Sequence, residues 1–132
     1  MAYVTLDPIK PIITETEVIL QPIYFEFNKS NITEAGAEEL DKLVEVMKAE
    51  EHKDMVIFAK SHTDNRGGDR YNLNLSDRRA KSTVQYIISK GISKDRISGQ
   101  GFGESEPKVV CDDCSEEEHA QNRRSEFLIV KK

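Results

Sequence analysis

A short apolar run, Met55–Ala59, most constrains the fold of this chain, because every residue in it is hydrophobic. Such a run is typical of a central β-strand that helices cover on at least one face. Helical patterns stand on both sides of it. The spacing of apolar residues predicts one helix over about 34–49 and a second helix with Ser76 as its N-cap and Gly91 as its C-terminal stop.

Other segments complete the pattern of strands. The alternation over Ile23–Phe27, preceded by Val18–Leu20, predicts an N-terminal strand in which Pro22 marks an edge, a bulge or a break between two short strands. A glycine-rich extended segment covers 96–103, where the glycines favour a bulge or close backbone packing. Ser125–Val130 supplies the last strand.

The resulting order is strand, helix, strand, helix, strand, strand. It predicts an α/β (α+β) sandwich, βαβαββ, with two main helices packed on a small mixed parallel and antiparallel sheet. A short helical turn is also expected over 116–121. A length of 132 residues suits one domain. We expect residues 1–21 to be a lead-in or linker and residues 22–132 to form the domain.

The charge balance argues against some classes of partner. The chain carries 19 basic and 24 acidic residues, a net charge of −5, so nucleic acid and anionic membranes are poor partners. No apolar run approaches the roughly 20 residues of a membrane helix, and we expect no direct membrane insertion. No signal peptide is visible, which leaves open a cytoplasmic protein or an excised domain of a secreted chain.

The stretch 61–81 carries the candidate binding site. It sets Asp64 and Arg79 near the two ends of a polar loop between the buried strand and the second helix. A strand end that faces a helix start is a common place for a binding site. The simpler interpretation is an ion pair between Asp64 and Arg79 that only fixes the loop.

Motifs for catalysis and for cofactors are not assembled. Ser61, His62 and Asp64 are residue types of a catalytic triad, but neighbours in a strand point to opposite faces. The glycines at 99, 101 and 103 lack the spacing of a dinucleotide site. Arg66 occupies what would be a ligand position of a calcium loop. We therefore expect no enzyme, no metal and no cofactor.

Cys111 and Cys114, with His119 nearby, allow more than one interpretation. Three such ligands could belong to a zinc site, but no fourth ligand or second CxxC motif is evident. Acidic neighbours disfavour a thiolate and hence a thioredoxin-like role. We favour a disulfide that ties the loop in an oxidising compartment.

Five segments stand in a fixed order along the chain: Ile23–Asn28, His62-Thr63-Asp64-Asn65-x-Gly67, Asn72-x-x-Leu75-Ser76-x-x-Arg79-Ala80, Gly101-x-Gly103-Glu104-x-x-Pro107 and Asn122-Arg123-Arg124-x-Glu126. Together, over about 22–131, they resemble the OmpA-like C-terminal domain, the peptidoglycan-binding module shared by OmpA, the peptidoglycan-associated lipoprotein and MotB. The fold of that family, helices on one mixed sheet, agrees with the order above. Ser61 departs from the glycine that is common in the family at this position.

The resemblance implies non-covalent binding of peptidoglycan through the meso-diaminopimelate of its peptide stem. It implies a periplasmic domain of an outer-membrane-associated protein, anchoring the outer membrane or a membrane protein to the cell wall of a Gram-negative bacterium. A periplasmic protein-interaction or assembly module of the same fold, without peptidoglycan binding, is the alternative.

The resemblance also assigns roles to residues. Asp64 would receive the ammonium of the ligand. Arg79, expected in the first turn of the second helix, would bind the carboxylate as a fork, helped by the helix N-terminus. The remaining positions that match the ligand surroundings of the family, or border them, are Asn28, Thr63, Asn72, Leu75 and Arg124.

Overall fold

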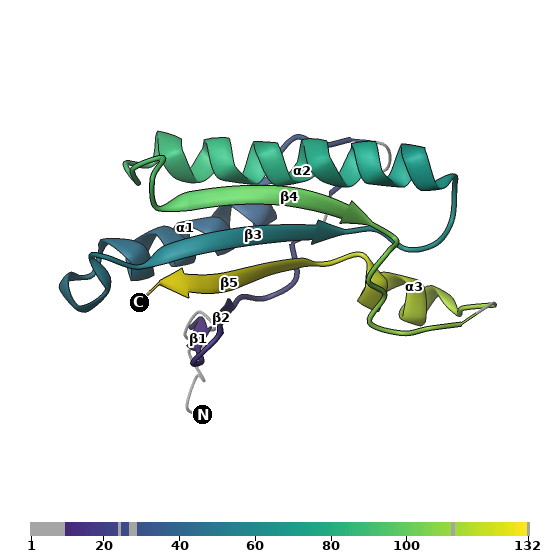
Figure 1. Cartoon of the computed structure of the whole chain (residues 1–132), viewed down its shortest axis with the longest axis horizontal. Helices are drawn as coiled ribbons and strands as arrows, with labels where there is room; N and C mark the ends of the chain where they lie inside the picture. The colour runs from purple at the N-terminus through teal and green to yellow at the C-terminus, as the bar shows by residue number, and fades with distance from the viewer. Residues whose placement is uncertain (1–9, 24, 27–28, 112, 132) are drawn as a thin grey trace, which may run out of the picture.

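The computed structural model describes residues 10–131 except Tyr24, Phe27, Asn28 and Asp112 (Figure 1). The elements are β1 (Ile12–Ile13), β2 (Glu17–Ile19), α1 (Glu34–Lys48), a 3-10 turn (Glu50–His52), β3 (Val56–His62), α2 (Asp69–Ser89), β4 (Ile97–Gly103), α3 (Glu116–Asn122) and β5 (Ser125–Lys131). The predicted fold class, helices on a mixed sheet, is confirmed. The turn expected over 116–121 is a helix of about two turns.

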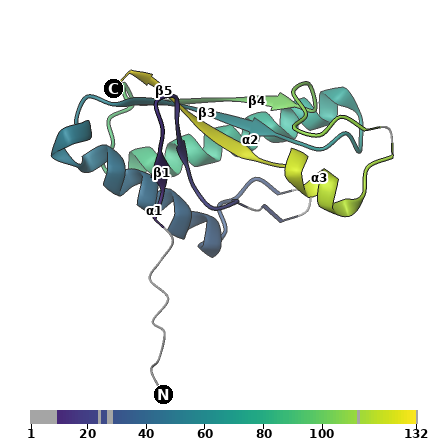
Figure 2. The same cartoon turned by 90° about the horizontal axis from the view of Figure 1, so that it is seen from below.

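The strands form one sheet in the order β1-β2-β5-β3-β4. β3 lies parallel to β4 and antiparallel to β5, and the remaining pairs are antiparallel. The parallel pair needs a crossover, which α2 provides. Figure 2 shows α1 and α2 on the same face of the sheet, so the main core lies between that face and the two helices.

Alternate residues of the apolar run in β3 belong to the main core. Ile57 and Ala59 point to the helices and are at most 2% exposed. They meet the apolar stripe of α1, which begins after Thr33 accepts a hydrogen bond from the backbone N–H of Gly36. Burying an isoleucine side chain such as that of Ile57 contributes about 1.5–3 kcal/mol. The helical and strand periods of the sequence therefore produce the same core.

Glycines on β4 let α2 approach the sheet very closely. A Cβ added to Gly101 would lie 2.1 Å from the backbone nitrogen of Asp77, and one added to Gly99 would lie 2.8 Å from Cγ2 of Val84. The predicted close backbone packing is thus confirmed. This contact fixes α2 relative to β4 and, through β4, relative to the end of β3.

The N-terminal strand differs from the prediction. Ile23, Phe25 and Glu26 form no strand, and the other residues of that alternation lie outside the described part of the chain. Instead β2, which overlaps the predicted Val18–Leu20, pairs with β5. Pro22 lacks a backbone N–H and cannot continue the ladder, which explains why pairing stops before it.

The start of α2 also differs. The helix begins at Asp69, with Gly68 as N-cap, so the prediction that Ser76 caps it is wrong. Ser76 lies inside the helix, where its hydroxyl donates to the carbonyl of Leu73 (2.9 Å) and accepts from the N–H of Gly103 (2.8 Å). The hydroxyl of Ser76 thus links α2 to β4, which explains a polar residue at this buried position. The helix ends before Gly91, as predicted, and Gly91 has a positive φ of 103°.

Candidate ligand-binding site

A pocket of about 450 Å³ opens where the end of β3 and the start of β5 meet α2 and α3. It brings together six of the seven ligand-binding residues predicted from the sequence: Thr63, Asp64, Asn72, Leu75, Arg79 and Arg124. The seventh, Asn28, lies outside the described residues. These residues are up to 61 positions apart in the sequence (63 to 124), and the β3–α2 connection and the start of β5 gather them.

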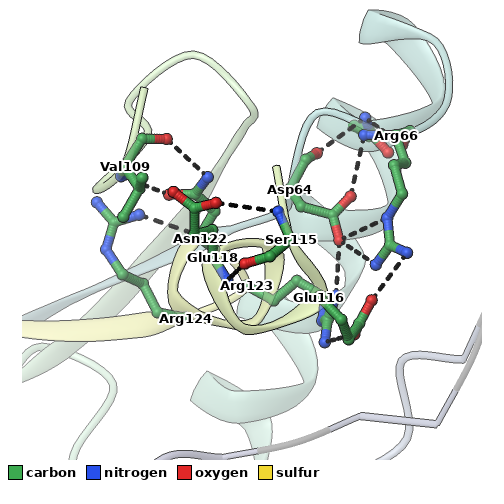
Figure 3. Close-up of polar contacts among 10 residues, drawn as sticks. Asp64, Arg66, Val109, Ser115, Glu116, Glu118, Asn122, Arg123 and Arg124 are labelled. Atoms are coloured by element: carbon green, nitrogen blue, oxygen red, sulfur yellow. Dashed lines mark hydrogen bonds and ion pairs between the residues drawn. The ribbon is translucent and has the colours of Figure 1, made fainter. Parts of the chain in front are cut away.

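Asp64 follows β3 and is 6% exposed. Its Oδ1 accepts the backbone N–H of Arg66 at 3.0 Å. Its Oδ2 accepts from Nη2 of Arg66 and from Nη1 of Arg123, both at 2.8 Å (Figure 3). Burial raises the pKa of Asp64, but these hydrogen bonds outweigh burial and hold the pKa at about 2. The carboxylate is therefore ionised at neutral pH.

Glu116 is a second carboxylate that bonds both Arg66 and Arg123. Its Oε2 accepts from Nη1 of Arg66 at 3.1 Å, and its Oε1 accepts from Nη2 of Arg123 at 2.8 Å. We call this arrangement of Asp64, Arg66, Glu116 and Arg123 the arginine–carboxylate ring. The α3 helix positions Glu116 in its first turn, which a capping box at Ser115 fixes.

Arg79 is 8% exposed and is held by backbone carbonyls. Its Nε donates to the carbonyl of Lys29 (3.0 Å) and its Nη2 to that of Glu26 (3.3 Å). The guanidinium also lies 4.8 Å from the ring centroid of Phe25. Burial lowers the pKa of Arg79, although the group stays charged. Asp64 pairs with Arg66 and Arg123 rather than with Arg79.

The prediction that Arg79 lies in the first turn of the second helix is wrong. Arg79 lies ten residues after Asp69, the first residue of α2, and not in the first turn. The free N–H groups at the start of α2 therefore cannot assist it, because they lie nearly three turns away.

Thr63 and Leu75 contribute a polar and an apolar group to the pocket. Thr63 is 5% exposed, and its hydroxyl has no hydrogen-bond partner in the part of the chain that the structure describes. A buried hydroxyl without a partner costs about 1–3 kcal/mol, so it is a candidate for contact with a ligand. Leu75 is 6% exposed and gives one wall its apolar character.

Asn72 supports the loop that carries Asp64. Its Nδ2 donates to the carbonyl of Arg66 (3.0 Å), and it lies 3.3 Å from that of Asp64 and 3.0 Å from Oε1 of Glu104. The amide nitrogen is therefore used within the protein and is not available to a ligand in this arrangement.

Among the lining residues that were not predicted from the sequence are Arg66, Arg123 and Tyr71. Arg66 and Arg123 contact Asp64, whereas the predicted Arg124 donates to the carbonyl of Glu106 (2.9 Å) and borders the pocket. Tyr71 lies four residues before Leu75, which lies four before Arg79, so the three share one face of α2. That spacing could have identified Tyr71 if the helix had been predicted to begin at Asp69.

Cys111 and Cys114 are joined by a disulfide directly before α3, with Cα atoms 5.4 Å apart. The carbonyl of Cys111 accepts from Nδ2 of Asn65 at 3.3 Å, which connects this loop to the loop of Asp64. Within the described residues, no group of three or more His, Cys, Asp or Glu side chains could hold a metal ion. The contacts thus place the disulfide beside the arginine–carboxylate ring.

Acid should weaken the folded state through Asp64. Because its pKa falls from 3.8 to about 2 on folding, its ion pairs add stability that is complete above pH 4 and is lost as the pH falls through 2. We expect the difference in unfolding free energy between wild type and Asp64→Asn to shrink over this range. Urea unfolding of both proteins at several pH values measures it. A difference that stays constant from pH 4 to pH 2 would contradict the ion pairing.

The chain is similar in sequence to known outer membrane proteins. A model of the OmpA family matches residues 24–123. Outer membrane protein A of Shigella flexneri is 38% identical over 107 residues, which are 80% of this chain and 31% of that protein. The protein of that name from Salmonella typhi is 42% identical over 92 residues, 68% and 26% of the two chains. The chain thus spans less than a third of the length of these two curated relatives.

Solved structures share the fold. The peptidoglycan-associated lipoprotein from Burkholderia pseudomallei superposes with a TM-score of 0.71 at 24% identity, over 81% of this chain and 87% of that one. The cell wall anchor of the T6SS from Pseudomonas aeruginosa gives a TM-score of 0.74 at 20% identity, over 95% and 89%. Among the described residues no helix is long and apolar enough to cross a bilayer.

Proposed function

Since the chain belongs to the OmpA family, we propose that it binds peptidoglycan non-covalently through the meso-diaminopimelate of the peptide stem. The domain then lies in the periplasm and anchors an outer-membrane-associated protein to the cell wall. The observation that carries the proposal is the pocket, in which an ionised carboxylate and a guanidinium, both buried, line one cavity. The disulfide between Cys111 and Cys114 suits an oxidising compartment.

The chemistry of the ligand fits these two groups. The distal end of meso-diaminopimelate carries an ammonium and a carboxylate on one carbon. Asp64 supplies the acceptor for the ammonium, and Arg79 supplies a planar donor for the carboxylate. Both contacts with the ligand are strengthened because the side chains of Asp64 and Arg79 are shielded from water. Leu75 and Phe25 offer apolar walls to the methylene groups, and Thr63 offers a hydroxyl without a partner among the described residues.

The charge of the pocket favours an anionic ligand. Four arginines and two carboxylates line it, two more positive charges than negative ones, although the whole chain carries −5. The arginines are Arg66, Arg79, Arg123 and Arg124, and the carboxylates are Asp64 and Glu116. A peptide stem with several carboxylates matches this local field better than a simple cation does.

Two stem peptides that differ in one group test the proposal. A lysine-containing stem lacks the distal carboxylate, so Arg79 would lose its partner. We expect it to bind about tenfold to a hundredfold more weakly than the diaminopimelate-containing stem. Isothermal titration calorimetry with both peptides measures the difference. Equal affinity would contradict the role of Arg79.

A conservative variant sharpens that comparison. Arg79→Lys keeps the positive charge but loses the two-donor fork, so the preference for the diaminopimelate stem should narrow. If neither peptide nor intact sacculi bind the wild type, the proposal fails.

A further inference from the structure

The carboxylate on which the proposed ammonium would bind is already occupied in the free domain. Oδ2 of Asp64 accepts from Nη2 of Arg66 (2.8 Å), from Nε of Arg66 (3.3 Å) and from Nη1 of Arg123 (2.8 Å). Figure 3 shows both guanidinium groups directed at this carboxylate. An ammonium therefore cannot bind Asp64 without replacing at least one of these donors.

The two arginines differ in how firmly they are held. Arg123 is 32% exposed, and its backbone N–H bonds to the carbonyl of His119 at the end of α3. Arg66 is 53% exposed and lies on the loop directly before Gly67, which has φ 94°. Its second partner, Glu116, is 67% exposed. Arg123 shares this exposed partner, so the difference lies in the arginines themselves. Ion pairs of the more exposed side chain add less stability, and Arg66 is therefore the easier one to displace.

We propose that Arg66 is an intramolecular competitor of the ligand, occupying Asp64 in the free domain and giving way to the ligand's ammonium. The inference rests on the proposed function. The exchange leaves no buried charge without a partner. The ammonium replaces one guanidinium on Asp64, Arg123 stays on Asp64 and Glu116, and the displaced Arg66 side chain, already 53% exposed, passes into water. The backbone N–H of Arg66 keeps its bond to Oδ1, so the loop itself need not move. Arg66 thereby lowers the affinity and excludes ligands that offer Asp64 no cation.

Removing the competitor should tighten binding. We expect Arg66→Gln to bind the diaminopimelate-containing stem peptide about two- to fivefold more tightly than the wild type. Calorimetry of both proteins at one salt concentration measures this. Arg70→Gln is the matched control, because Arg70 is also exposed and the net charge changes equally. This control should bind no more tightly than the wild type.

A second measurement follows the displaced group. Nuclear magnetic resonance can follow the arginine Nε–H signals while the peptide is added. The Arg66 signal should move toward the position of a free arginine, and the Arg123 signal should keep the position of an ion-paired arginine. Equal or weaker binding by Arg66→Gln, with normal binding by the wild type, overturns this inference alone. Absence of binding by the wild type overturns the proposed function and this inference with it.

Discussion

Replacing Asp64 by asparagine is expected to abolish retention of the domain on purified peptidoglycan sacculi. Asparagine has nearly the same shape but no charge, so the ligand's ammonium would lose its counter-ion and would face arginines. Truncating one partner of a buried charge pair weakens binding by about a hundredfold or more. Co-sedimentation of wild type and variant with sacculi measures the loss.

Two controls separate binding from folding in that experiment. Asp95→Asn makes the same change in net charge at an exposed position outside the pocket, and should be retained like the wild type. Circular dichroism should show a cooperative thermal transition for Asp64→Asn. Retention of a folded Asp64→Asn variant at the wild-type level would contradict the role of Asp64.

Replacing Gly101 by alanine is expected to destabilise the domain by about 3 kcal/mol or more. The new Cβ would lie 2.1 Å from the backbone nitrogen of Asp77 and 2.4 Å from the backbone carbon of Ser76. No side-chain rotation relieves a clash with backbone atoms, so α2 must move away from β4. Urea unfolding at neutral pH measures the free energy.

Gly68→Ala provides the matched comparison. Apart from its chain neighbours, no atom of the described residues lies within 4 Å of the Cβ that it would add, and Gly68 has φ −80°. Its unfolding free energy should fall by less than about 1 kcal/mol, because alanine is a poorer N-cap than glycine but meets no backbone clash here. If Gly101→Ala unfolds at the same urea concentration as Gly68→Ala, then α2 does not need the close approach to β4.

Hydrophobic periodicity predicted most of the elements. Helix α1 and strands β3 and β5 have strong apolar patterns because one face of each meets a single core, whereas β4 was predicted from its glycines. The first turns of α2 were missed because their leucine, Leu73, is 50% exposed and lies off the buried face, so it does not fit a helical apolar stripe. The alternation over 23–27 indicated a strand, yet Ile23 and Phe25 are apolar because they line the pocket and pack against the core.

The sequence predicted several of the residues that line the pocket, but not the contacts between them. The spacing of the motifs placed Asp64 and Arg79 near one loop, and the structure lines one pocket with both. The ion pair between Asp64 and Arg123 joins residues 59 positions apart and depends on the orientation of α3. Nothing in the sequence distinguished Arg123 from Arg124, since the chain direction before β5 decides which side chain faces Asp64.

The sheet is paired unevenly, and this determines how the domain would respond to a mechanical load. Two residue pairs join β1 to β2 and two join β2 to β5, whereas six pairs join β3 to each of its neighbours. A pulling force that enters through the residues before Ile12 would separate β1 and β2 first. The edge of the sheet would then extend and absorb work while β3, α2 and the pocket keep their geometry. A domain paired in this way would extend at its N-terminal edge before its pocket lost its geometry.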